Sequence, residues 1–137
     1  MTTDPIRRRA ACSCGALSIT CTGAPVRVSV CHCLACRVRT GSAFGWQARW
    51  PDDAVRIEGA ATEWTRTGDE GSRITYRFCP VCGRTVYYTN EGEPGFVAVP
   101  AGGFADVDFP APTVSVYDPA RVAPWLTITA EPLERLG

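Results

Sequence analysis

Apolar and polar residues alternate along much of the chain, as they do in β-strands that bury one face. The clearest run is 73–78, in which Ile74, Tyr76 and Phe78 share a face. The same alternation, or a concentration of β-branched and aromatic residues, predicts further strands. These cover residues 17–21, 26–30, 44–50, 55–57, 63–66, 85–89 and 96–99. The pattern therefore predicts a mainly β fold.

Turn residues between these runs indicate where the chain reverses. Gly23-Ala24-Pro25 predicts a hairpin-like return between residues 17–21 and 26–30, which brings Cys31 to the end of a strand. The one predicted helix runs from Leu34 to Arg39 and is closed by Gly41, since glycine readily adopts the left-handed conformation that ends helices. Residues 100–124 are rich in Pro, Gly and Ala and are expected to form a surface loop. Trp125-Leu126 is expected to be an anchoring core contact rather than a stacking platform.

Length and charge exclude several classes of function. The 137 residues fit one domain, spanning 1–137, that can bury a core. Fourteen basic and fourteen acidic residues balance, so the chain carries no electrostatic footprint for nucleic acid. Every basic residue is arginine and histidine occurs once, which excludes a Schiff-base lysine, a phosphate-loop lysine and a metal site built from several histidines.

Compartment and cysteine use point in the same direction. The N-terminal stretch from Met1 to Arg9 has no apolar run that could act as a signal peptide, and no later stretch reaches membrane-spanning length. We therefore expect a cytoplasmic protein without a membrane partner. Seven of the eight cysteines fall in tight clusters, which in a reducing compartment favours metal binding over disulfides. The eighth, Cys21, lies on the apolar face of its strand and is expected to pack in the core.

Two of the cysteine pairs have the spacing of a closed metal site. Cys79-Pro80-Val81-Cys82-Gly83 is typical of a zinc knuckle, in which a tight turn aims both sulfurs at one ion. Cys12 and Cys14 are two residues apart and would share a face in an extended segment. Together the four thiols predict a structural zinc site that ties the N-terminal strand to the knuckle, and the alternative is two unrelated pairs.

The remaining cluster, Cys31-His32-Cys33-Leu34-Ala35-Cys36, offers three thiols and no fourth. Three protein ligands are typical of a catalytic zinc that keeps one position open, so we interpret Cys31, Cys33 and Cys36 as the catalytic metal site. A substrate thiol could bind there as a thiolate, or a carbonyl could be polarised.

Three polar neighbours of this cluster each have two interpretations. His32 would point away from the sulfurs, either as a hydrogen-bonded or partly exposed imidazole behind the site or as a proton carrier. Arg37 and Arg39 could clasp the carboxylates of an anionic thiol such as glutathione, or could be solvated surface charges.

These motifs together resemble those of the glutathione-dependent formaldehyde-activating enzymes, a family that includes the centromere protein V relatives. The resemblance covers nearly the whole chain. The matching residues are Cys12-Ser13-Cys14-Gly15, Cys31 to Arg37 with Gly41-Ser42-Ala43-Phe44, Phe78-Cys79-Pro80-Val81-Cys82-Gly83, and Pro124-Trp125.

The resemblance implies a fold of twisted antiparallel β-sheets, of the class of type B methionine sulfoxide reductases, with two zinc ions per chain. It also implies the activity, the condensation of formaldehyde with glutathione, which is a carbon–sulfur lyase reaction written in reverse. Many family members have a histidine before the C-terminal Pro-Trp, whereas residues 113–117 of this chain contain none.

Other functions remain open at this point. A non-catalytic binding module would use the second zinc only to stiffen a surface, with its fourth position filled by protein or by a partner chain. A methionine sulfoxide reductase is disfavoured, because redox turnover needs a metal-free nucleophilic cysteine and only Cys21 is spare. The expected partners are a small thiol and an aldehyde, and a homodimer is an alternative to a monomer.

Overall fold

The fold was analysed in a computed structural model that describes residues 5–137. The sequence-based expectation for Met1–Arg9 falls partly on residues 1–4, which lie outside the described residues. The described part is mainly β, as predicted. Its strands are β1 (Arg7–Ala11), β2 (Ser18–Thr22), β3 (Arg27–Cys31), β4 (Gly45–Pro51), β5 (Val55–Glu58), β6 (Thr62–Thr67), β7 (Arg73–Phe78), β8 (Thr85–Asn90), β9 (Phe96–Pro100), β10 (Val114–Val116) and β11 (Glu134–Leu136). Its α-helix is α1 (Leu34–Thr40), and short 3-10 helices span Asp52–Ala54 and Ala101–Phe104.

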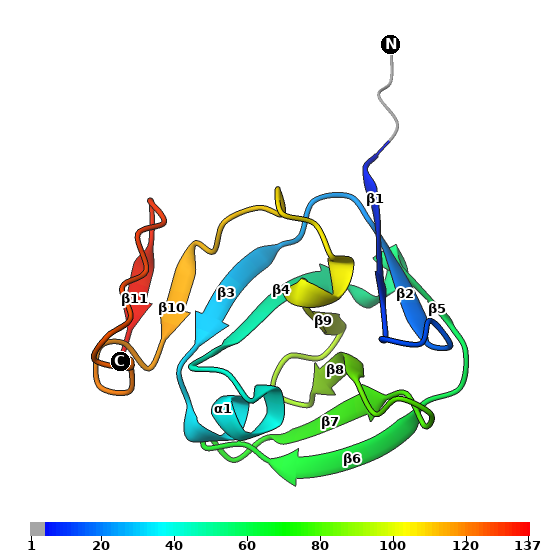
Figure 1. The fold of residues 1–137 in the computed structure, drawn as a ribbon, viewed down its shortest axis with the longest axis horizontal. Coiled ribbons are helices and arrows are strands. Elements are labelled where there is room, and N and C mark those ends of the chain that lie inside the picture. Colours follow the sequence, from blue (N-terminus) through cyan, green and yellow to red (C-terminus); the bar gives the residue numbers. More distant parts are fainter. Residues whose placement is uncertain (1–4) are drawn as a thin grey trace.

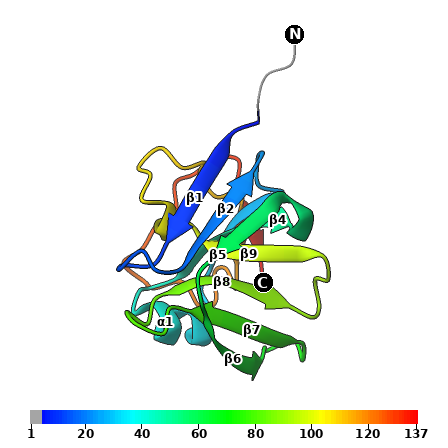
Figure 2. The same cartoon turned by 90° about the vertical axis from the view of Figure 1, so that its right-hand side faces the viewer.

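The strands form two sheets. A three-stranded sheet has the order β1-β2-β5, and an eight-stranded sheet has the order β11-β10-β3-β4-β9-β8-β7-β6. Figure 1 shows the larger sheet curving from β11 to β6, with the smaller sheet at one side, and Figure 2 views the smaller sheet from that side. Neighbouring strands are antiparallel except that β10 pairs in parallel with both β3 and β11. Among residues 5–137, no helix is long and apolar enough to cross a membrane.

The hydrophobic core lies between the two sheets. Leu17 and Ile19 are fully buried at β2, and Trp50 and Val99 are fully buried on the facing strands of the larger sheet. Burying each such side chain contributes about 1.5–3 kcal/mol. The indole N–H of Trp50 donates to the carbonyl of Gly23 at 3.0 Å, so its polar atom is satisfied. Cys21 is fully buried in this core, as predicted.

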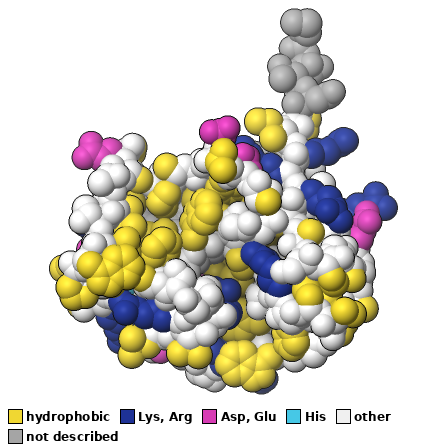
Figure 3. Space-filling view, viewed as in Figure 1, with side chains coloured by type: hydrophobic (Ala, Val, Ile, Leu, Met, Phe, Trp, Pro, Cys, Tyr) yellow, Lys and Arg dark blue, Asp and Glu magenta, His cyan; other side chains and the backbone are white. Residues whose placement is uncertain are grey.

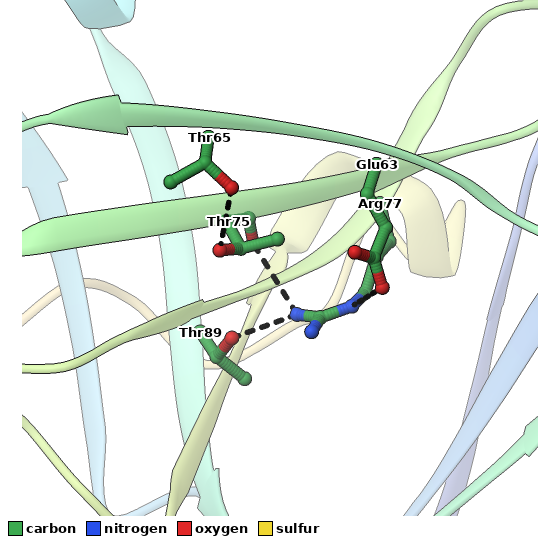
Figure 4. A network of polar contacts seen from close by, with 5 residues as sticks. All are labelled: Glu63, Thr65, Thr75, Arg77 and Thr89. Atoms are coloured by element: carbon green, nitrogen blue, oxygen red, sulfur yellow. Dashed lines mark hydrogen bonds and ion pairs between the residues drawn. The ribbon is translucent and has the colours of Figure 1, made fainter.

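The face of β6, β7 and β8 opposite Ile74 and Tyr76 carries a polar network (Figure 4). Arg77 donates to Thr89 Oγ1 at 2.7 Å and pairs with Glu63 at 3.3 Å. The hydroxyls of Thr65 and Thr75 lie 2.9 Å apart across β6 and β7. Since side chains alternate along a strand, Tyr76 and its cross-strand neighbours lie on the other face of the sheet from this network.

The predicted hairpin between residues 17–21 and 26–30 is wrong. The two strands belong to different sheets, because the Gly23–Pro25 turn carries the chain from one layer to the other. The backbone N–H of Gly23 donates to the carbonyl of Ile6, and the backbone N–H of Val26 donates to the carbonyl of Arg49. The two sides of the turn are therefore bonded to different segments of the chain.

The predicted surface loop at 100–124 is also wrong in part. It contains β10, whose Ser115 is fully buried, and Phe109 packs into the core with 7% exposure. Three residues are too few for an alternating pattern to stand out. Trp125, expected as a core anchor, is 78% exposed.

Candidate metal centres

The four-cysteine cluster, defined as Cys12, Cys14, Cys79 and Cys82, joins the end of β1 to the turn after β7. Its four sulfurs all lie within 4.8 Å of one another, with Cys14 Sγ 3.7 Å from Cys12 Sγ and 3.6 Å from Cys79 Sγ. Cys12 and Cys79 are buried and the other two are exposed. The sequence therefore predicted this grouping correctly across 65 positions.

The local reason differs from the predicted one. Cys12 and Cys14 do not share the face of an extended strand, since β1 ends at Ala11 and a turn follows, closed by Gly15 N–H to the Cys12 carbonyl at 3.1 Å. The knuckle is closed similarly by Gly83 N–H to the Cys79 carbonyl at 2.9 Å. Both turns aim backbone N–H groups at sulfur.

Backbone N–H groups favour the thiolate form of Cys12 and Cys82. Leu17 N–H points at Cys12 Sγ at 3.3 Å, and Val81 N–H at Cys79 Sγ at 3.3 Å. The backbone donor from Leu17 lowers the pKa of Cys12, and donors from Arg84 and Cys14 lower the pKa of Cys82 to about 6. The backbone N–H of Ala16 acts to lower the pKa of Cys14, but contact with the Cys79 sulfur and burial raise it to about 11. Four convergent thiols, two of them with a lowered pKa, fit a soft cation held entirely by protein.

The three-cysteine cluster, defined as Cys31, Cys33 and Cys36, lies where β3 meets α1. Cys31 ends the strand, Cys33 is the N-cap of the helix, and Cys36 lies in its first turn. The Cys33 sulfur accepts the backbone N–H of Cys36 at 3.2 Å, so it caps the helix as a serine would. The three sulfurs lie within 4.8 Å of one another. The predicted helix is confirmed, and Gly41 closes it with φ 67°.

The three sulfurs of this cluster shift one another's pKa values, which bears on the kind of ligand that the cluster can bind. Hydrogen bonds from the Cys31 and Cys36 thiols lower the pKa of Cys33 to about 2, and the same contact with Cys33 raises the pKa of Cys31. Sulfurs this close oppose one another's ionisation, and a bound cation would offset that repulsion, so the donor set fits a metal ion.

A cavity of about 290 Å³ opens beside this cluster. All three of its cysteines line the cavity, whereas the four-cysteine cluster contributes none of the described lining residues. The strand registers place many lining side chains on one face of the larger sheet, opposite the core. They include Val116 and Leu136, Arg27, Ser29 and Cys31, Gln47 and Arg49, Phe96 and Ala98, Tyr88 and Asn90, and Ile74 and Tyr76.

An ion pair between distant segments closes the rim of the cavity. Arg121, after β10, pairs with Asp69, in the β6–β7 turn, at 3.0 Å. These segments lie near opposite ends of the strand order, so the sheet curls far enough for loops near its two ends to meet. Figure 3 shows arginine side chains in dark blue near α1 and along β1, with apolar side chains gathered over β10 and β11.

Three guanidinium groups line the cavity. Arg49 pairs with Glu93 at 2.6 Å. Arg66 Nε donates to the hydroxyl of Tyr76 at 3.2 Å. Burial acts to lower the pKa of Arg66, but the bond to Tyr76 and the nearby Cys33 and Cys36 raise it overall. This cation therefore lies at the end of the cavity nearest the three-cysteine cluster, which we call the sulfur end. Arg27 Nε is buried and has no hydrogen-bond partner among the described residues.

Arg37 and Arg39, the predicted substrate contacts, lie near the three-cysteine cluster but have other contacts. Arg37 donates through Nη2 to the carbonyl of Arg121, and Arg39 lies over the rings of Tyr76 and Tyr88 at 5.3 and 5.4 Å. Neither belongs to the described residues that line the cavity. Both guanidinium groups thus have partners within the protein, although the Nε of each is buried without a hydrogen-bond partner among the described residues, as it is in Arg27. Arg39 also stays beside the cluster, since a Cβ at Gly45 would lie 3.3 Å from Arg39 Nη2 and 3.2 Å from Cys36 Sγ.

The cavity arginines were missed by sequence reasoning. Arg27 could have been found, because it alternates with Ser29 and Cys31 along β3 and so shares their face. Arg66 carried no such signal, since it is 30 positions from Cys36.

His32 lies behind the cluster, as the first of its two interpretations predicted. It is fully buried, and its Nε2 is 3.0 Å from Ser115 Oγ. Burial lowers the pKa of His32, so the ring is neutral at pH 7. It is not among the described residues that line the cavity, which argues against a role as proton carrier.

Comparisons with known proteins agree with the cysteine pattern and the fold. The family model described as glutathione-dependent formaldehyde-activating enzyme matches residues 7–119. A crystal structure of a Rhodobacter sphaeroides protein, a structural genomics target, is similar with a TM-score of 0.57. It is 21% identical to this chain over 73% of this chain and 90% of its own, a likeness that concerns the fold alone. No curated protein sequence matches the chain.

Proposed function

Because the chain belongs to the glutathione-dependent formaldehyde-activating enzyme family, we propose that it is a zinc-dependent carbon–sulfur lyase that adds an anionic thiol to a small aldehyde such as formaldehyde. The three-cysteine cluster would hold the catalytic zinc and the four-cysteine cluster a structural zinc. The observation that carries this proposal is the difference in surroundings, since only the three-cysteine cluster opens into the cavity.

The donor sets support this division. Four thiolates fill the tetrahedral coordination of zinc, whereas three leave one position for a substrate. When bound, zinc supplies the Lewis acidity that lowers the pKa of a substrate thiol, so that the thiol ionises near neutral pH. The reaction joins the thiol sulfur to the aldehyde carbon. The carbon–oxygen double bond becomes a single bond, and the thiol proton ends on the aldehyde oxygen.

Two residues at the sulfur end assist this addition. Arg66 offsets the negative charge that a fourth sulfur brings to three thiolates, because like charges at contact distance repel. Its bond to Tyr76 fixes its orientation. Burial raises the pKa of Tyr88, which lines the same cavity, so its phenol keeps its proton and donates a hydrogen bond to the developing oxyanion.

The far end of the cavity binds the anionic part of the thiol. Arg27 and Ser29 alternate with Cys31, and four residues of strand span about 13 Å. Arg27 is paired across the strands with Arg49, but among the described residues 5–137 only Arg49 has a carboxylate partner, Glu93. A substrate carboxylate supplies the missing negative charge. In this proposal the anion-binding role that the sequence suggested for Arg37 and Arg39 passes to Arg27 and Arg66.

Exchange NMR with ¹³C-labelled formaldehyde and glutathione tests this function. The wild-type protein should raise the rate of exchange between free aldehyde and S-hydroxymethyl adduct above the uncatalysed rate. Cys36→Ser should return the rate to background, while Cys21→Ala, a cysteine variant outside both clusters, should retain it. A wild-type rate equal to background with several thiol–aldehyde pairs would instead favour a zinc-stabilised binding module.

A further inference from the structure

Four polar side chains form a chain of contacts behind the three-cysteine cluster. His32 Nε2 is 3.0 Å from Ser115 Oγ, Ser115 Oγ donates to Asp118 Oδ2 at 2.8 Å, and Arg135 Nη1 donates to the same oxygen at 2.6 Å. The contacts link the loop between β3 and α1 to β10 and then to β11. His32 and Ser115 are fully buried, and the Asp118 side chain is 3% exposed.

The donors and acceptors in this chain have one consistent direction. Ser115 has a single hydroxyl proton, and it is given to a carboxylate that can only accept. Ser115 Oγ must therefore accept from His32 Nε2–H, which fixes the tautomer of the ring. The serine stands between histidine and aspartate and is fully buried away from the cavity, so this is not the arrangement of a nucleophilic triad.

The position of His32 connects this chain of contacts to the two cysteines on either side of it. His32 lies between Cys31 and Cys33, whose sulfurs converge on the cavity side. The ring is held on one side by Ser115 and packs against Phe44 at 5.9 Å, so the loop cannot rotate without breaking a buried hydrogen bond. The backbone adds a bond from His32 N–H to the carbonyl of Val116 at 3.1 Å.

We propose that Arg135, Asp118, Ser115 and His32 act as positioning residues that hold the Cys31 and Cys33 sulfurs at metal-binding spacing. Strand β10 has only three residues, and its pairing with β3 is parallel. The buried side-chain contacts therefore supply much of what fixes its register against the cysteine loop. The metal affinity of the three-cysteine cluster then depends on Arg135, which is 99 positions from Cys36. This inference rests on the proposed metal site.

Cobalt titration tests the inference without an activity assay. Protein carrying one equivalent of Zn²⁺ in the four-cysteine cluster is titrated with Co²⁺, and thiolate-to-cobalt absorption reports binding at the three-cysteine cluster. Ser115→Ala should weaken cobalt binding about 10- to 100-fold, the range found for outer hydrogen-bond partners of metal ligands. Thr75→Val removes a hydrogen-bonded hydroxyl from the outer face of β7 and should bind cobalt like the wild type.

Arg135 provides a second variant whose replacement leaves no cavity in the core, since its side chain is 48% exposed. Arg135→Gln should weaken cobalt binding, and Arg135→Lys, which keeps the cation, should restore most of it. Wild-type affinity in both Ser115→Ala and Arg135→Gln would overturn the positioning role. Equal losses in the glutamine and lysine variants would also overturn it. A wild-type protein that binds no cobalt at the cluster would overturn the proposed metal site itself, which is a separate result.

Discussion

Gly45 leaves the space that the Cys36 side chain occupies, so Gly45→Ala perturbs the three-cysteine cluster without removing a ligand. Gly45 begins β4, and Cys31 is its cross-strand partner. A Cβ at this position would lie 3.1 Å from Cys36 Cβ, 3.2 Å from Cys36 Sγ and 3.3 Å from Arg39 Nη2. Contacts this short force the sulfur to move by a few tenths of an ångström.

The size of the effect follows from the tolerance of the metal site. Metal–ligand distances tolerate changes of about 0.2 Å. Without metal the sulfur can turn away, so the strain falls mainly on the metal-bound form. Overpacking costs about 1–3 kcal/mol, which corresponds to roughly 5- to 150-fold weaker metal binding. Competition titration against a zinc chelator measures this loss.

Gly102→Ala is the matched control, because a Cβ there meets no atom within 4 Å. It should leave both metal affinities unchanged. The reasoning predicts that Gly45→Ala weakens only the three-cysteine cluster and leaves the four-cysteine cluster as in the wild type. Wild-type affinity at both clusters in Gly45→Ala would refute it, and so would an equal loss at both.

Three further predictions concern the division of roles. Partial chelation should remove about one equivalent of zinc while far-ultraviolet circular dichroism persists, because the four-cysteine cluster is closed; loss of both ions together with unfolding would contradict this. Cys79→Ser should give unfolded or insoluble protein, whereas Cys36→Ser should stay folded and lose the second zinc, as circular dichroism and metal analysis would show. Arg27→Ala and Arg66→Ala should each raise the KM for glutathione severalfold in steady-state kinetics. Arg39→Ala should mainly lower the melting temperature, because its packing on the tyrosines is lost. The reverse pattern would contradict the assignment of the cavity arginines to substrate binding.

Sequence reasoning succeeded where short-range chemistry decides the outcome. Cysteine spacing predicted both clusters, although Cys12 and Cys14 converge through a turn and not through the extended segment that we expected. Gly41 ended the helix for the same local reason. The strand at 73–78 was found because its alternation is long enough to read, and the strand at 85–89 because β-branched and aromatic residues are concentrated there.

What sequence reasoning missed depends on contacts between distant segments. β10 is three residues long in a stretch rich in proline and glycine, and its pairing with β3 determines it more than its own pattern does. The arginines were assigned by nearness along the chain to Cys36, whereas the curl of the larger sheet brings Arg66 to the sulfurs and leaves Arg39 stacked on tyrosines. The link between His32 and Ser115 spans 83 positions, which no spacing rule covers.

The most direct test of the account is whether an added thiol binds at the three-cysteine cluster. Protein with Co²⁺ in that cluster is titrated with glutathione while the cobalt absorption is recorded. The account predicts a saturable spectral change as a fourth sulfur joins the coordination, with weaker binding in Arg66→Ala. A spectrum that stays unchanged at saturating glutathione would contradict the account, because it would mean that the site is closed to this thiol.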